Sequence, residues 1–320
     1  MRRASRLATA VLVGLTARAA AQQPEATSLL GKPLVPPPPP AAAKADLEAK
    51  LAQARQAWER TPNDPDSIIW LGRRTAYLGR YRDAIAIFGD GIAKHPKDAR
   101  LYRHRGHRYI TVRRFDDAIR DLRRAYRLSK GKPDQIEPDG MPNARGIPTS
   151  TLQSNIRYHL ALAHYLEGDF GKARPYWQED VAAAVNPDMV VASSHWLYMT
   201  LRRLGKKRDA DRVLEPIHPG MEIIENGSYH RLLLMYKGLV TPDSVAAGGA
   251  GDAIQDATVG YGIGNWHLYN GRAAQAGEIF DRILAMPQWA AFGYIAAEAE
   301  VARNNGKGEG GRGKGTAAVR

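Results

Sequence analysis

Two pairs of histidines come nearest, by residue type and spacing, to a metal site in this sequence. His104 and His107 are three residues apart, which on a helix places both side chains on one face, as a zinc pair requires. They lie among arginines that would repel a cation, and no acidic third ligand stands beside them. His159 and His164 are five residues apart and do not share a helix face. The sequence therefore predicts packing or surface lining for these histidines, and no metal site.

Two further motifs match phosphate-binding or catalytic patterns only in part. Gly260, Gly262 and Gly264 have the glycine spacing of a phosphate loop, but no strand precedes them as that loop requires. Ser129 and Lys132 have the serine-to-lysine spacing of some hydrolases without the other elements of that motif. Because the chain has no cysteine, thiolate metal sites and cysteine nucleophiles are excluded. We expect no catalytic residues and no cofactor.

The composition indicates a folded chain with a surplus of positive charge. Hydrophobic residues make up 44% of the 320 residues and charged residues 25%, as in ordinary soluble proteins. The formal net charge is +13, which favours acidic peptides, anionic glycans or lipid headgroups as partners. One long domain, two domains or a repeat array all fit this length.

The first residues have the layout of a secretory signal peptide. Arg2, Arg3 and Arg6 precede an apolar run at 7–15, and three alanines at 19–21 provide a cleavage site. The apolar run is too short for a bilayer core, which needs about 20 residues. We therefore expect residues 1–21 to direct export to the periplasm or the outside of the cell, with no stable membrane insertion. Export also argues against a nucleic-acid partner.

Six pairs of matching residues stand 34 positions apart in the first half of the chain. They are Pro62 and Pro96, Asp64 and Asp98, Gly72 and Gly106, Tyr81 and Phe115, Ala84 and Ala118, and Phe88 and Leu122. A pair of antiparallel helices needs such positions: a small residue where the helices approach, an aromatic at the turn, and apolar residues that pack the second helix back. An acidic residue near a proline suits the start of the next helix.

This pattern resembles the tetratricopeptide repeat family, whose unit is a helix-turn-helix of 34 residues. The segment "YLGRYRDA", followed by "IF" and "HP", carries the match, whereas the second unit has Arg113 in place of the turn glycine. Looser copies surround Gly168, Gly205 and Gly271. The resemblance implies an all-α fold, a right-handed solenoid of tetratricopeptide-type helix-turn-helix repeats over residues 45–303.

Low-complexity segments are expected on both sides of this array. Residues 22–44 are rich in proline and alanine and include five consecutive prolines, which favour an extended linker. Residues 304–320 are rich in glycine and basic, without apolar periodicity, and are expected to form a disordered tail.

An inserted loop is expected at residues 129–152, where four prolines and a "PDG" turn exclude a helix. A connection of this length is usually functional or disordered. Ile136, Met141 and Ile147 are expected to anchor it as a packed loop near the groove mouth, and a floppy linker is the alternative. The loop residues expected to contact a ligand are Asp139, Asn143 and Arg145.

The family resemblance also implies where a ligand binds, because the first helix of each unit lines the concave surface of the array. This groove is expected to be cationic at one end and aromatic in the middle. Such a surface suits an extended peptide with carboxylates, since arginine pairs with them bidentately and tyrosine adds flat contact area. Alternatively, the arginines only keep an exposed face soluble. The expected groove residues are Arg73, Tyr77, Arg100, Arg103, His107, Asn155, Tyr158, Tyr165, His195 and Arg202.

The sequence thus predicts a non-catalytic scaffold or adaptor that binds a protein or peptide, with acidic ligands as one option. One alternative is an envelope-assembly helper that binds anionic polymers. The other is an enzyme with a site near the 129–152 loop that the motifs do not reveal.

Overall fold

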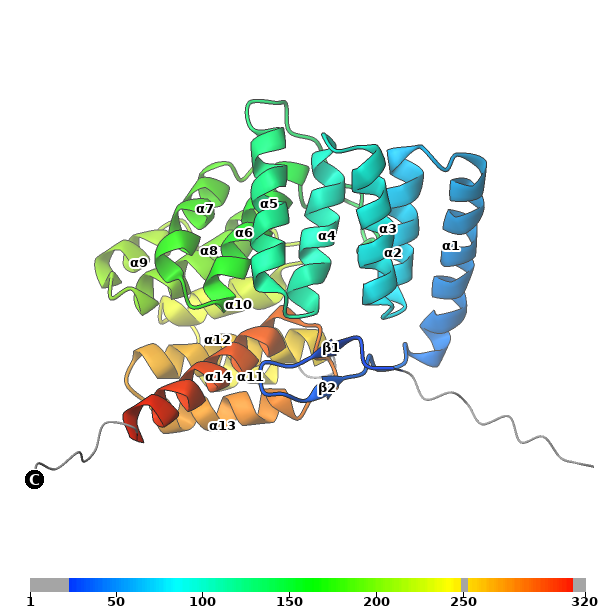
Figure 1. The fold of residues 1–320 in the computed structure, drawn as a ribbon. Helices are drawn as coiled ribbons and strands as arrows, with labels where there is room; N and C mark the ends of the chain where they lie inside the picture. The colour runs from blue at the N-terminus through cyan, green and yellow to red at the C-terminus, as the bar shows by residue number, and fades with distance from the viewer. Residues whose placement is uncertain (1–22, 249–252, 313–320) are drawn as a thin grey trace, which may run out of the picture.

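A computed structural model describes residues 23–248 and 253–312, so the expected signal peptide lies outside the described residues. In these residues the chain forms fourteen α-helices and one two-stranded antiparallel sheet (Figure 1). The strands are β1 (Ala26–Thr27) and β2 (Pro33–Leu34). The helices are α1 (Ala41–Arg60), α2 (Pro65–Tyr77), α3 (Tyr81–Lys94), α4 (Ala99–Thr111), α5 (Phe115–Ser129), α6 (Leu152–Leu166), α7 (Phe170–Ala182), α8 (Pro187–Arg203), α9 (Lys207–Val213), α10 (Gly227–Tyr236), α11 (Pro242–Ala247), α12 (Ala253–Tyr269), α13 (Ala273–Leu284) and α14 (Phe292–Arg312).

The helices from α2 to α9 form four consecutive helix-turn-helix units. Each helix from α1 to α9 packs against the next, and the first helices α2, α4, α6 and α8 also contact one another in sequence. Asp64 and Asp98 start two of these first helices, because their carboxylates accept hydrogen bonds from the backbone N–H groups of Ser67 and Arg100, each at 2.9 Å. The predicted all-α solenoid of tetratricopeptide-type units is confirmed.

Close approach within the units depends on two of the repeated glycines. A Cβ atom built on Gly72 would lie 2.4 Å from a ring carbon of Phe88, and one on Gly106 would lie 2.7 Å from Cγ of Leu122. These distances leave no room for a side chain, so the glycines let α2 meet α3 and α4 meet α5. The 34-residue spacing therefore records helix packing.

The C-terminal helices lie below the array. Figure 1 shows α12, α13 and α14 as a layer under the ends of α4 to α7. Three contacts fix α14 to the turns inside the units: Arg113 with Glu298, Arg203 with Glu300, and Arg303 with the Leu166 carbonyl. The layer thereby closes one end of the repeat units.

Part of the segment expected to be an extended linker, residues 22–44, packs against the rest of the chain. Ala26 and Leu34 pair in the small sheet and are buried in the same core as α14. The Trp289 indole N–H donates to the Val35 carbonyl at 2.8 Å, and Pro36 contacts Gly79. Apolar burial and these bonds hold the segment in place, and α1 already begins at Ala41.

The C-terminal boundary also differs from the expectation. The last helix continues to Arg312, so it includes the first nine residues of the segment predicted as a tail, while residues 313–320 lie outside the described part. None of the described helices is both long and apolar enough to cross a membrane.

Candidate binding site on the inner wall

The expected groove residues lie on the first helices of four units, whose shared face we call the inner wall. Each of them is buried or half-buried, which shows that other parts of the chain cover this wall. They are Arg73 and Tyr77 on α2, Arg100, Arg103 and His107 on α4, Asn155, Tyr158 and Tyr165 on α6, and His195 and Arg202 on α8.

The far end of the inner wall is covered by α10 and α12. Tyr165 and His195 are fully buried, so the structure places them in the core and corrects the expectation that they face a ligand. The Tyr165 hydroxyl lies 2.7 Å from that of Tyr261, and the His195 ring stacks on Tyr229 with centroids 4.7 Å apart. Arg202 at the edge donates to the side chain of Asn270. The fold uses this end for packing.

Arg100 faces a different opening from the other expected groove residues. It lines a pocket of about 510 Å³ between the ends of α4, α5 and α6. Its guanidinium is held by the Asp98 carboxylate at 2.6 Å and by Asp66. Both partners come from the helix starts, so Arg100 joins two units and is not a member of the groove.

The inserted loop, residues 130–151, covers the opposite end of the inner wall. Glu137 and Arg103 form an ion pair of 2.9 Å with both side chains less than 10% exposed. Arg74 donates to the Gly140 carbonyl at 2.7 Å, and Gly140 lies so close to Tyr77 that a Cβ atom there would meet its hydroxyl. The loop is packed on α2 and α4, not a floppy linker.

Polar contacts, not apolar anchors, hold this loop. Ile136, Met141 and Ile147 are 66%, 64% and 43% exposed, so their predicted role as anchors is wrong. Asn143 folds the loop on itself by donating to the Ile147 carbonyl, and it also donates to Glu225.

The two other loop residues expected to contact a ligand differ in exposure. Asp139 is half-buried, and burial together with the nearby Glu225 carboxylate raises its pKa. Arg145 is exposed, and its backbone N–H donates to the side chain of Asn143. The nearby Arg73 guanidinium opposes the rise in the pKa of Asp139.

A small cavity remains under the loop, and we call it the arginine pocket. It has a volume of about 100 Å³, and three arginines, two histidines and one glutamate are among the residues that line it. Burial and the neighbouring arginines push the pKa of His104 and of His107 well below the ordinary value, so both rings are neutral. The lining residues are Arg73, Ala76, Tyr77, Phe88, Arg103, His104, His107, Arg108 and Glu137.

The middle of the inner wall is open at a second cavity, which we call the aromatic pocket. Its volume is about 280 Å³, and it contains two of the expected groove residues, Asn155 and Tyr158. The lining residues are Thr149, Ser150, Ser154, Asn155, Tyr158, His159, Met189, Ala192, Ser193, Glu225, Asn226, Tyr229 and Phe292.

The walls of the aromatic pocket are rigidly held. The Trp196 indole N–H donates to the Tyr158 hydroxyl at 2.7 Å, and the Tyr158 and Tyr229 hydroxyls are 3.0 Å apart. The Asn155 amide donates to Ser150 at 2.9 Å. Burial raises the pKa of Tyr158 well above its ordinary value, so this hydroxyl stays protonated. The pocket thus presents fixed hydroxyl and ring surfaces.

Sequence reasoning missed most residues of this pocket, including three that come from other elements than the first helices. Glu225, Tyr229 and Phe292 come from the connection before α10, from α10 itself and from the start of α14. The second unit's 34-residue pattern does not extend to these elements, so no spacing signal pointed to them. Glu225 is exposed and is the carboxylate that lines the pocket.

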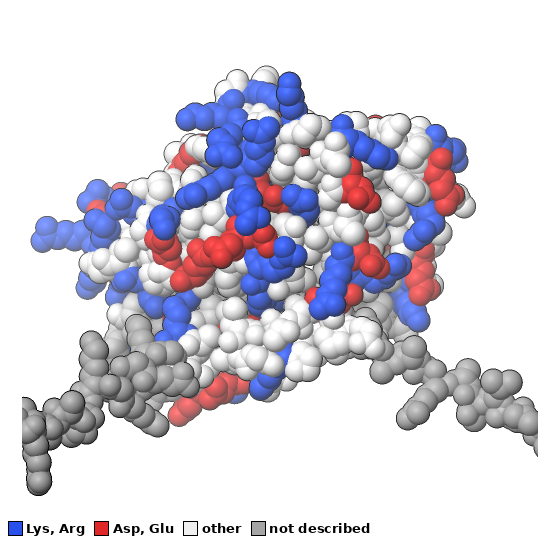
Figure 2. All heavy atoms as spheres, viewed as in Figure 1, with Lys and Arg blue, Asp and Glu red and all other residues white. Residues whose placement is uncertain are grey.

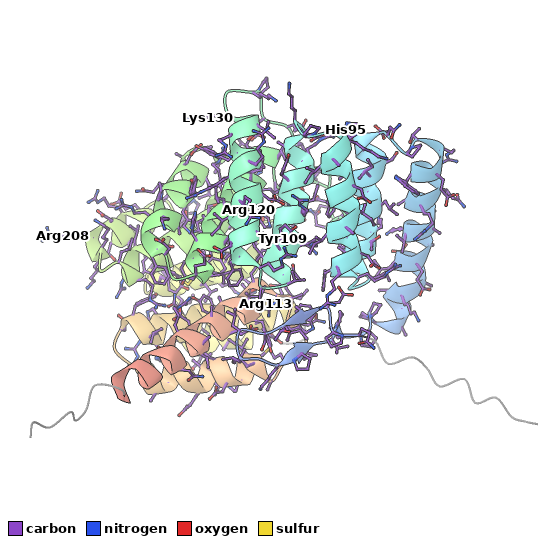
Figure 3. All side chains as sticks on the ribbon, viewed as in Figure 1. His95, Tyr109, Arg113, Arg120, Lys130 and Arg208 are labelled. Carbon is purple, nitrogen blue, oxygen red and sulfur yellow. The ribbon has the colours of Figure 1, made fainter. Side chains whose placement is uncertain are left out.

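Arginines crowd the outer face of the second unit. Figure 2 shows lysine and arginine side chains gathered over α5 and the connection above it. Arg114 and Arg120 both pair with Asp117, and Arg105 pairs with Asp121, so acids neutralise part of this surface. In Figure 3 the labelled Arg120 and Lys130 lie along α5, away from the lower layer.

No protein-family model and no curated protein sequence matches the chain. Among solved structures, it is similar to YrrB, described as a TPR protein with an unusual peptide-binding site, at 16% identity, over 78% of this chain and 97% of that one, with a TM-score of 0.40. It is also similar to a tetratricopeptide repeat protein from Parabacteroides merdae, at 12% identity, over 81% and 94% of the two chains, with a TM-score of 0.47.

The chain has a tetratricopeptide-type repeat fold. Its own helix pairs and close-approach glycines carry this assignment. Within this fold the inner wall is divided into a covered arginine pocket, an open aromatic pocket and a buried far end.

Proposed function

We propose that this tetratricopeptide-type chain is a non-catalytic scaffold that holds a segment of a partner protein at the aromatic pocket. The observation that carries the proposal is the opening of about 280 Å³ beside Asn155 and Tyr158, on a wall whose two ends are covered by the chain itself. A cavity of this size accepts one large side chain of a peptide lying across the wall. Pre-formed walls favour such binding, because little side-chain motion must be lost on association.

The chemistry of the pocket favours a lysine or arginine side chain from the partner. Tyr158, Tyr229 and Phe292 provide ring faces that attract cations, and Glu225 provides a carboxylate at the mouth. Among the described residues, no arginine or lysine lines this pocket. This pocket therefore does not offer the basic side chains that an acidic ligand, the option raised by the net charge, would need as counter-ions.

The test is a selection of random displayed peptides against the full chain, followed by affinity measurements on the enriched peptides. We expect enrichment of one lysine or arginine. Glu225→Gln should weaken these peptides by about tenfold or more, because it removes one charge-assisted hydrogen bond. Ala192→Met, which fills the pocket from α8, should abolish binding.

Glu222→Gln is the matched control, since Glu222 is exposed on the same connection and does not line the pocket. If Glu225→Gln and Glu222→Gln change the affinity equally, and Ala192→Met leaves it intact, the aromatic pocket is not the binding site.

A second candidate function is binding of an anionic polymer by the outer face. Arg123, Arg127 and Lys130 are exposed on or just after α5, and within the described residues none of them pairs with a carboxylate. Polyanion binding should then fall steeply with salt and with an Arg123→Gln and Arg127→Gln double variant. The aromatic-pocket variants should leave it unchanged.

We also propose that the chain is exported, because residues 1–21 have the charge and hydropathy pattern of a signal peptide. Mass spectrometry of the mature N-terminus, from cell fractions, tests this. An intact N-terminal methionine in the cytosolic fraction would contradict it.

A further inference from the structure

The arginine pocket has more positive charge than its own residues neutralise. Arg73, Arg103 and Arg108 line it, and Glu137 is the carboxylate that faces them. Glu137 reaches one of the three, Arg103, at 2.9 Å. Within the described residues, Arg73 and Arg108 form no ion pair and instead lie over the rings of Trp70 and Tyr81. Buried charges are normally paired, so this pocket lacks negative charge.

One buried hydrogen-bond donor of the pocket also lacks an acceptor. The Nε atom of Arg103 is buried without a partner, in a side chain that is 7% exposed. Arg103 Nη1 faces His107 Nδ1 at 3.4 Å, and Arg108 Nη2 faces His107 Nε2 at 2.6 Å. A neutral imidazole accepts at one nitrogen only, so His107 can serve one of these two guanidinium groups, and Arg103 Nη1 also faces His104 Nδ1 at 3.2 Å. The pocket therefore contains at least one buried guanidinium N–H, that of Arg103 Nε, which its own groups leave unsatisfied.

We infer that the arginine pocket binds one small oxyanion, a phosphate or a carboxylate group. Its oxygens would accept from Arg73, Arg103 and Arg108, and its charge would offset the surplus. The cavity of about 100 Å³ is about three water volumes, which suits a compact anion and excludes a nucleotide or a peptide. This site is separate from the aromatic pocket: the two cavities share no residue.

Glu137 competes with such an anion. It stands on the inserted loop, its Oε2 atom is buried without a partner, and its carboxylate repels any second anion in the cavity. The loop therefore brings an internal carboxylate to the same guanidinium groups. Neutralising Glu137 should strengthen the binding of an external anion, a result that a merely structural role of the loop does not produce.

The experiment is calorimetric titration of the full chain with inorganic phosphate and, separately, with acetate, at constant ionic strength set by chloride. We expect saturable binding of one anion per chain. Arg73→Gln should weaken it at least about tenfold, because one charge-assisted contact is lost. Glu137→Gln should tighten it by a similar factor. Arg120→Gln, the same change on the exposed face of α5, is the control and should have no effect.

The two titrations separate the sources of the anion: binding of phosphate alone identifies a phosphate site, and binding of acetate as well identifies a general oxyanion site. Arg73 is half-buried and free of ion pairs in the described structure, so its variant should keep the fold, as circular dichroism can verify. The inference is overturned if neither anion binds more than chloride does, or if Arg73→Gln and Arg120→Gln have equal effects. It is also overturned if Glu137→Gln fails to raise the affinity.

Discussion

At the scale of single residues, Arg113 shows how a departure from the repeat pattern is stabilised. Among the described residues, Arg113 is the one residue other than glycine whose backbone φ is positive, at 64°. The corresponding turns of the other units have glycine at this position, namely Gly79, Gly168 and Gly205, with φ between 71° and 84°. Such a backbone costs about 1–3 kcal/mol for a residue with a side chain. Its guanidinium offsets this cost, because it donates to the Trp289 carbonyl and pairs with Glu298 at 2.7 Å.

Arg113→Met should lower the free energy of unfolding by about 3–5 kcal/mol, because it leaves the buried Glu298 carboxylate without its counter-ion. Arg114→Met is the control: Arg114 is the next residue, and its pair with Asp117 is largely exposed, so the loss should be about 0–1 kcal/mol. Urea denaturation measures both. Similar losses for the two variants would show that the buried pair has no special role.

His195 should make the fold sensitive to acid. Burial lowers its pKa from 6.5 to about 3, so the folded state keeps it neutral while the unfolded state takes up a proton below pH 6.5. Its contribution to stability is therefore present above pH 6.5 and is lost as the pH falls. Between pH 6.5 and 4.5 this one group accounts for about 2–3 kcal/mol.

The check is to compare the unfolding free energies of the parent chain and a His195→Gln variant at pH 7.5 and 4.5. The variant is expected to be less stable at pH 7.5 but to lose less on acidification. An unchanged pH dependence would mean that other buried histidines, such as His164 with its pKa lowered to about 4, carry the effect.

At the scale of elements, small residues set how closely the helices of a unit pack. Gly72→Ala should destabilise the chain by about 1–3 kcal/mol, because the new methyl group would overlap the Phe88 ring. Gly89→Ala is the matched control in α3, where the nearest atom is a flexible arginine nitrogen at 3.5 Å. There the higher helix propensity of alanine should stabilise by about 0.5–1 kcal/mol. Thermal unfolding distinguishes the opposite signs, and equal signs would refute this account.

The helices of the units could be predicted from the sequence because their determinants are local. In each unit the two residues that meet lie on consecutive helices: Gly72 and Phe88 on α2 and α3, and their counterparts 34 residues later on α4 and α5. The cover of the inner wall could not be predicted, since it depends on contacts between distant segments. Glu298 binds Arg113, which is 185 positions away in the sequence, and no repeat spacing in the sequence predicts this pair. Asn155 and Tyr158 were found by position, but Glu225 and Phe292 beside them were not.

At the scale of the whole molecule, the N-terminal strands and α14 depend on each other. Leu34 is buried at 6% exposure against the core that includes α14, while the next residue, Val35, is 43% exposed. Leu34→Asp should detach the strands and speed amide exchange in the middle of α14 by at least about tenfold, since burying an unpaired carboxylate is costly. Val35→Ser should leave exchange unchanged. Equal exchange rates in both variants would show that α14 is stable without the strands.

The contact between the two ends of the described chain has a consequence for how the molecule comes apart. An open stack of repeats can lose its terminal units first, because each unit is supported on one side only. Here Glu298 accepts from the Leu29 backbone N–H and binds Arg113, so the first strands, the second unit and the last helix share one carboxylate. Because this carboxylate joins the strands, the second unit and α14, we expect these three parts of the described chain to unfold together in a single cooperative step.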